Sequence, residues 1–121
     1  HRDVSELVFA ASFAATNPIV EGRGSPPERV PALIYFDTVA GMNFEPTDYV
    51  DVTEMMQTKR EMLGAHVSQV STLRDTFDVE ILDEIEVCAR YRGLQAHVRY
   101  AEAFQTCRTW HRVRPTRLLP G

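Results

Sequence analysis

The chain has 121 residues, of which 44% are hydrophobic and 25% are charged, and its formal net charge is -4. This length and composition are ordinary for one globular domain with its own core. The net negative charge argues against a nucleic-acid partner, because phosphate binding needs a concentrated basic face. No apolar run approaches the ~20 residues that cross a bilayer, so we also expect no membrane span.

Two cysteines, Cys88 and Cys107, lie far apart in the sequence and form no CxxC pattern. Two such residues do not make a disulfide framework, and isolated cysteines usually behave as small buried apolar residues in reduced proteins. We therefore expect a cytoplasmic protein.

The first part of the chain is predicted to be an amphipathic helix followed by a surface loop. Apolar residues recur at helical spacing over residues 2–15. Pro18 ends the pattern, because a proline disfavours helical geometry in the residue before it. Residues 17–31 contain four prolines and two glycines, which is typical of a loop.

Two strands are predicted next. Residues 32–36 form a continuous apolar run, which is typical of a strand buried on both faces of a parallel sheet. After a loop over residues 39–48, residues 49–52 form a second and shorter strand. Thr53 is the predicted N-cap of the following helix, where its hydroxyl would accept a free amide of the first turn.

The stretch after Thr53 is predicted to be a helix that reaches about residue 70. Its apolar residues share one face and are Met56, Leu63, Val67 and Val70. Lys59 and Arg60 are expected to point towards solvent. A polar break is expected over residues 71–78.

A third helix is predicted over residues 79–93, with Gly93 as its C-cap. Its second face is acidic and carries Glu80, Asp83, Glu84 and Glu86. A solvated surface explains such a face better than a metal site does, because runs of like charge are usual on exposed helices. Residues 98–105 alternate with period two and predict a strand. The basic tail from residue 109 is expected to be irregular.

The predicted order is helix, strand, strand, helix, helix, strand, which indicates a layered α/β architecture. Three strands are too few for a doubly wound sheet, and the first helix has no strand before it. The pattern therefore suggests that part of the sheet lies elsewhere.

The chemistry-bearing residues do not reveal a site by spacing alone. The four histidines, at 1, 66, 97 and 111, form no H-x3-H pair, whereas a catalytic zinc needs about three protein ligands and one open position. His97 and His111 match no motif and are expected at the surface. The residues by themselves indicate a globular α/β domain with an incomplete sheet.

Three stretches nevertheless form a recognisable set. The first stretch begins with YVDVT at residues 49–53 and continues into a lysine-containing helix that ends with AHVSQ at residues 65–69. The second is HRD at residues 1–3, and the third is YAEAF at residues 100–104. In this order they resemble the LmbE-like (PIG-L) zinc-dependent de-N-acetylases. The resemblance implies a Rossmann-like layered sheet with flanking helices, of which residues 1–121 are the C-terminal half of a single domain.

The resemblance also implies a mechanism. In that family an AHPDDE loop supplies one His and one Asp to zinc and a second Asp as general base, and a later HPDH motif supplies the third ligand. Only the last position of HPDH falls in this chain, on His1. The zinc would activate water and polarise the acetyl carbonyl. The other interpretation of His1 is a tag remnant or a frayed terminus.

Three further residues are expected near the substrate. His66 is either a group of the substrate pocket or a histidine fixed by hydrogen bonds between a helix end and the next loop. Tyr100 lies near the substrate entrance in the resembled family, although a packed edge residue explains it equally well. Glu102 would bond sugar hydroxyls, or else pair with an arginine such as Arg92 or Arg99.

Two functional hypotheses follow. The preferred one is zinc-dependent hydrolysis of the N-acetyl group of an amino sugar or its conjugate, performed by the complete enzyme. Its partners would be that substrate and the missing N-terminal half, and a homo-oligomer is also possible. The fragment alone is expected to be inactive. The alternative is a non-catalytic carbohydrate-binding or interaction protein that retains the scaffold.

Overall fold

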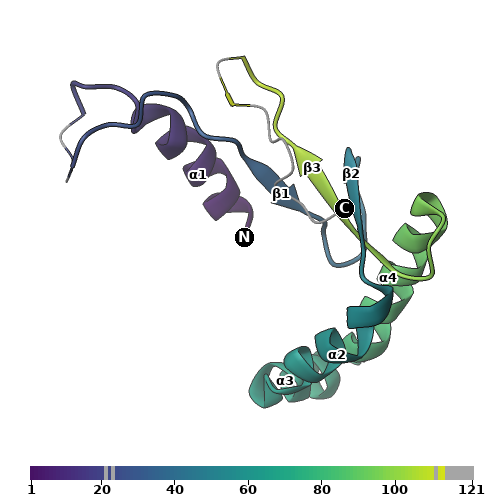
Figure 1. Ribbon diagram of the computed structural model, residues 1–121. Coiled ribbons are helices and arrows are strands. Elements are labelled where there is room, and N and C mark those ends of the chain that lie inside the picture. The colour runs from purple at the N-terminus through teal and green to yellow at the C-terminus, as the bar shows by residue number, and fades with distance from the viewer. Residues whose placement is uncertain (21, 23, 111, 114–121) are drawn as a thin grey trace.

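The computed structural model describes residues 1–20, 22, 24–110 and 112–113, and these form a mixed α/β fold (Figure 1). In chain order the elements are α1 (Arg2–Ala14), β1 (Ile34–Phe36), β2 (Asp48–Asp51), a 3-10 helix (Thr53–Met55), α2 (Met56–Gly64), α3 (Val67–Phe77), α4 (Ile81–Ala96) and β3 (Ala101–Thr106). Figure 1 shows α1 at one end of the molecule and helices α2, α3 and α4 gathered at the other, with the sheet between them. The predicted α/β class is confirmed at this level.

Helix α1 confirms the helix predicted over residues 2–15 but buries none of its side chains. Its exposed large apolar residues are Val4, Leu7, Val8, Phe9 and Phe13. Arg112 attaches the helix to the rest of the chain by donating to the Phe9 carbonyl at 3.1 Å and to Ser12 Oγ at 2.9 Å. A helix that is apolar on several sides is normally buried. Helix α1 therefore presents an apolar surface that the described residues leave uncovered.

The three strands form one antiparallel sheet in the order β1-β3-β2. Phe36 of β1 pairs with Phe104, and Val50 of β2 pairs with Glu102. The prediction that residues 32–36 belong to a parallel sheet is therefore wrong, because in the described part of the chain β1 pairs antiparallel with β3. The prediction failed because this apolar run is not buried on both faces of the sheet. The exposed fraction of Phe36 is 79%. The last strand lies at the centre of the sheet.

The turn after β2 differs from the predicted N-cap. The Thr53 hydroxyl caps no helix, and instead accepts the backbone N–H of Tyr100 at 3.2 Å. The Thr53 amide donates to the carboxylate of Asp51 at 2.9 Å. Val52 also donates to the Tyr100 carbonyl at 3.0 Å. These bonds extend the β2–β3 pairing beyond the strands, so Thr53 stabilises the sheet rather than a helix terminus.

We predict that Thr53→Ala lowers the free energy of unfolding by about 1–3 kcal/mol, because it leaves the buried Tyr100 amide without an acceptor. Thr53→Ser, which keeps the hydroxyl, should retain most of the stability. Urea denaturation of the complete protein measures both changes. Hydrogen exchange locates the effect: faster exchange at α2 amides with no change at Tyr100 would restore the helix-cap explanation.

The polar break predicted over residues 71–78 is wrong, because α3 continues to Phe77 and ends at Asp78 in the left-handed conformation, with φ of 54°. Serine and threonine are tolerated here: Ser71 and Thr72 bond through their hydroxyls to the Ser68 carbonyl, one turn earlier. Each hydroxyl thus finds its partner on the preceding turn, and the helix continues through the polar stretch. The single predicted helix up to residue 70 is thus two helices, α2 and α3.

Gly93 is not a helix C-cap, since α4 continues past it to Ala96 and His97 takes the left-handed capping position, with φ of 59°. The chain then turns back across the helix at Gly93. A Cβ at this position would stand 2.7 Å from the Arg99 carbonyl oxygen and 2.8 Å from that of Val98. The glycine is required because backbone passes directly over it. The expectation that His97 is a surface residue is confirmed.

We predict that Gly93→Ala lowers the free energy of unfolding by about 1–3 kcal/mol or more, because the clash is with backbone and displaces the turn that leads into β3. Gly64→Ala is the matched control. Its Cβ meets only a Leu82 methyl at 4.0 Å, and alanine favours a helix over glycine by roughly 0.5–1 kcal/mol. Equal thermal stability of the two variants would contradict the close-approach argument.

The core lies between the sheet and helices α2 and α4. Its buried members are Val50, Val52, Met56, Ala89, Tyr100 and Phe104. None of the helices in the described part of the chain combines the length and apolar character needed to cross a membrane. Most of the tail predicted to be irregular, together with His111, lies outside the described residues.

Candidate functional site

A cavity of about 300 Å³ lies between the sheet, the loop after β1 and helices α2 and α4. We call it the sheet-side cavity. Its lining residues are Phe36, Asp37, Thr38, Val39, Lys59, Ile85, Cys88, Ala89, Arg92, Ala101, Glu102, Ala103 and Phe104. Alanines and aromatic rings form its apolar part, and two ion pairs supply its polar part. An apolar hollow with a few fixed polar groups, at the small end of the usual size range, is typical of a small-molecule site.

The first ion pair joins Arg92 of α4 to Asp37, the residue after β1. Two guanidinium nitrogens of Arg92 donate to the two carboxylate oxygens, at 2.6 and 3.0 Å. The side chains are nearly enclosed, with exposed fractions of 4% for Arg92 and 17% for Asp37. The hydrogen bond to Asp37 raises the pKa of Arg92 further above its ordinary value. This two-pronged geometry is the strongest form of such a pair, so it fixes the wall of the cavity.

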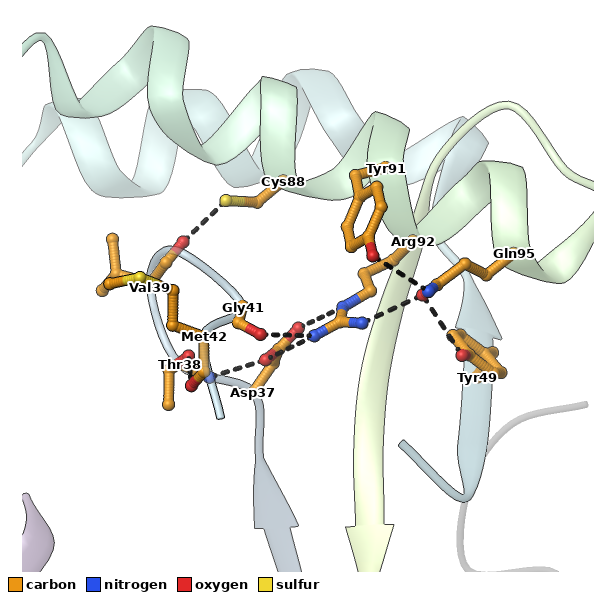
Figure 2. Close-up of polar contacts among 10 residues, drawn as sticks. All are labelled: Asp37, Thr38, Val39, Gly41, Met42, Tyr49, Cys88, Tyr91, Arg92 and Gln95. Atoms are coloured by element: carbon orange, nitrogen blue, oxygen red, sulfur yellow. Dashed lines mark hydrogen bonds and ion pairs between the residues drawn. The ribbon is translucent and has the colours of Figure 1, made fainter. Parts of the chain in front are cut away.

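Arg92 also joins both edge strands to the helix, as Figure 2 shows. It donates to the Gln95 side-chain oxygen at 2.9 Å, and the same oxygen accepts the hydroxyl of Tyr49 in β2 at 3.2 Å. On the other side it donates to the Gly41 carbonyl at 3.3 Å. One side chain of α4 therefore positions β1, β2 and the intervening loop.

The loop over residues 38–42 is anchored a second time by Cys88 (Figure 2). Its Sγ lies 2.6 Å from the Val39 carbonyl oxygen. Burial raises the pKa of the Cys88 thiol, and the nearby negative charges of Asp37 and Glu84 raise it further. A thiol in such surroundings stays protonated and is a poor nucleophile. Cys88 is thus a structural residue of the cavity wall.

The second ion pair joins Lys59 of α2 to Glu102 of β3, with Nζ 2.6 Å from Oε1. The exposed fractions are 34% and 37%, so the pair stands at the mouth of the cavity. Lys59 does not point into solvent as expected, and neither does Arg60, which donates to Glu86 at 2.8 Å. The partner of Glu102 is a lysine and not one of the arginines considered from the sequence.

The predicted site residues do not all lie together. Glu102 lines the sheet-side cavity, whereas Tyr100 lines a separate groove on the other flank of α4. His1 is exposed at the N-cap position of α1 and makes no capping bond with its side chain. His66 is exposed between α2 and α3, and in the described residues only its backbone forms hydrogen bonds. The hydrogen-bonded role considered for the His66 side chain is therefore not found there.

Zinc requires about three protein ligands. Within the described part of the chain, no three His, Cys, Asp or Glu side chains stand close enough together to hold a metal ion. The residues present thus do not form a zinc site by themselves, and no catalytic step through zinc follows from their geometry. The described residues offer instead fixed hydrogen-bonding groups around an apolar hollow, which suits binding of a small polar molecule.

Sequence reasoning missed Arg92 and Asp37, although a signal for Arg92 was present. Arg92 follows Ile85 and Ala89 at helical spacing, so it lies on the apolar face of its helix. A charge in that position needs a buried partner. Asp37 was the first acidic residue after an apolar strand, but nothing in the sequence indicated which of the acidic residues would be that partner.

Comparison with family models, with curated proteins and with solved structures finds no match in any of the three.

We predict that Arg92→Leu lowers the free energy of unfolding of the complete protein by about 3–5 kcal/mol, because it leaves the Asp37 carboxylate buried and unpaired. The double variant Arg92→Leu/Asp37→Leu should recover most of this loss, since two apolar residues replace the pair. Arg74→Leu, which breaks an exposed pair with Glu80, is the control and should change little. If Arg92→Leu lowers the free energy of unfolding no more than Arg74→Leu does, the pair of Arg92 with Asp37 does not stabilise the fold.

Proposed function

We propose that this chain is the C-terminal half of a zinc-dependent de-N-acetylase that acts on an N-acetylated amino sugar or its conjugate. The proposal rests on the resemblance of residues 1–3, 49–69 and 100–104 to the LmbE-like enzymes. In this proposal the antiparallel sheet is one margin of a larger Rossmann-like layered sheet. The apolar surface of α1 then packs against the part of that domain that precedes it.

The observation that carries the proposal is the contact between the resembling stretches. Residues of YVDVT pair with residues of YAEAF as neighbouring strands, with Tyr49 opposite Ala103 and Asp51 opposite Ala101. The lysine of the helix that follows, Lys59, binds the glutamate of the second stretch, Glu102. Stretches about fifty residues apart in the sequence thus form one unit beside a cavity, as parts of one site would.

In the proposed enzyme the sheet-side cavity receives part of the sugar. Lys59 occupies Oε1 of Glu102, and Oε2 remains an acceptor for a sugar hydroxyl. The apolar faces of Phe36 and Phe104, whose ring centres are 5.6 Å apart, suit the C–H surface of a pyranose. The residues of this chain would thus bind and orient the substrate, while the general base comes from the preceding half.

His1 is the residue of this chain that would coordinate zinc, through one imidazole nitrogen at the start of α1. The remaining ligands belong to the proposed N-terminal half. Zinc, when bound, would activate a water molecule for attack on the acetyl carbonyl. His66 and Tyr100 are assigned as flanking residues of the substrate entrance, on the strength of the resemblance alone.

The test uses the complete protein and its His1→Ala variant. Zinc content is measured by plasma mass spectrometry, and acetate release is measured with N-acetylglucosamine and one of its alkyl glycosides. We expect His1→Ala to lower both the zinc content and the rate of acetate release. Loss of a group that only orients a zinc ligand lowers activity roughly 10- to 100-fold, so loss of a ligand itself should lower it by at least that factor.

His97→Asn is the matched control, because it changes an exposed histidine and asparagine tolerates the left-handed backbone at that position. It should retain native zinc content and activity. Native zinc content and acetate release in His1→Ala would overturn the assignment of His1. Binding of the sugars without any acetate release by the zinc-loaded native protein would instead favour the non-catalytic carbohydrate-binding alternative.

A further inference from the structure

The flank of α4 that faces away from the sheet-side cavity carries an open groove of about 630 Å³. We call it the Tyr100 groove. Its lining residues are Asp83, Glu86, Val87, Arg90, Arg99 and Tyr100. They come from α4 and from the turn that leads into β3. The proposed function uses one residue of this groove, Tyr100, and leaves its charged residues without a role.

Tyr100 is a fixed platform in this groove. The residue is 7% exposed, and its hydroxyl donates to Glu86 at 2.7 Å. Its backbone N–H and carbonyl are both bound to the turn after β2, to Thr53 and Val52 respectively. Because both its hydroxyl and its backbone are hydrogen-bonded, the Tyr100 ring keeps one orientation. Side chains that contact the ring therefore also lose conformational freedom.

Two guanidinium groups lie over the Tyr100 ring. The guanidinium carbon of Arg99 lies 5.3 Å from the Tyr100 ring centre and that of Arg90 lies 5.9 Å from it. Both distances fall within the range of cation–π attraction. The ring attracts each cation, and neither guanidinium donates a hydrogen bond within the described part of the chain. Both guanidinium carbons thus lie within 5.9 Å of the centre of the same ring.

The acidic residues of the groove form their hydrogen bonds and ion pairs with groups other than these two cations. Glu86 uses one oxygen for the Tyr100 hydroxyl and the other for Arg60, at 2.7 and 2.8 Å. Asp83 faces Arg60 as well, at 3.5 Å. In the described part of the chain neither Arg90 nor Arg99 has a carboxylate partner. With Arg60 included, three guanidinium charges stand against the two carboxylate charges of Asp83 and Glu86, which leaves the groove a net positive charge.

We propose that the Tyr100 groove is a binding site for a phosphate group, either as inorganic phosphate or as a phosphomonoester. Planar guanidinium groups donate paired N–H bonds that match phosphate oxygens. A guanidinium that is already held beside a fixed ring loses less conformational entropy when the ligand binds. Val87, which is exposed at the rim, provides an apolar contact for an organic substituent of a phosphomonoester. The phosphate contacts come from Arg90 and Arg99, to which the proposed deacetylation assigns no role.

The experiment measures binding by isothermal titration calorimetry with the complete protein at low salt. One arm uses inorganic phosphate and the other glucosamine 6-phosphate. We expect saturable binding, with Kd raised about tenfold in Arg90→Gln and in Arg99→Gln, since each variant loses charge-assisted bonds. The double variant should show no saturable binding. Arg29→Gln, which removes an exposed arginine from a loop, should keep the native Kd.

The two arms distinguish the sources of the phosphate. Tighter binding of glucosamine 6-phosphate would assign the groove to an organic phosphate, and equal Kd values would assign it to the phosphate group alone. Circular dichroism checks that each variant is folded. The proposal is overturned if neither probe binds saturably to the native protein, or if the folded double variant binds with the native Kd.

Discussion

The structure depends on one enclosed guanidinium, that of Arg92. It binds Asp37 at the end of β1 and, through the Gln95 side chain, reaches Tyr49 in β2, so both edge strands are tied to the helix that crosses the central strand. A carboxylate and a guanidinium removed from water are stable only when their bonds are satisfied. The geometry of the sheet, the loop after β1 and the cavity wall therefore all depend on the same few hydrogen bonds.

Local sequence patterns predicted most of the elements but not how they are joined. The helix predicted over residues 2–15 is found as α1, and the strand predicted over residues 98–105 is found as Ala101–Thr106, because periodicity is a local property. Strand direction is not local: residues 32–36 carry the apolar run of a parallel strand, yet β1 pairs antiparallel with β3. Gly93 and Thr53 were misread for a related reason, because each serves a contact with the chain near Tyr100, which no local pattern reveals.

The candidate site was predictable in part. The resembling motif stretches directed attention to Glu102 and Tyr100, and both border hollows beside α4, although on different flanks. Lys59 was missed as a partner of Glu102 because a lysine on a helix is usually solvated. The pairing of Arg92 with Asp37 was not predictable, since it depends on which loop the folded chain lays against the helix face. Charge partners across a fold follow from topology, which a single sequence specifies only indirectly.

The central position of β3 sets the order in which the chain can mature during synthesis. β1 and β2 leave the ribosome before the strand that separates them, and Ile34 must wait for Thr106 before its backbone partner exists. Until then their hydrogen-bonding edges and the apolar residues of the later core have no permanent neighbours. Non-local pairing of this kind slows folding and prolongs exposure to aggregation. A nascent chain stalled before residue 101 is thus a natural client for a chaperone.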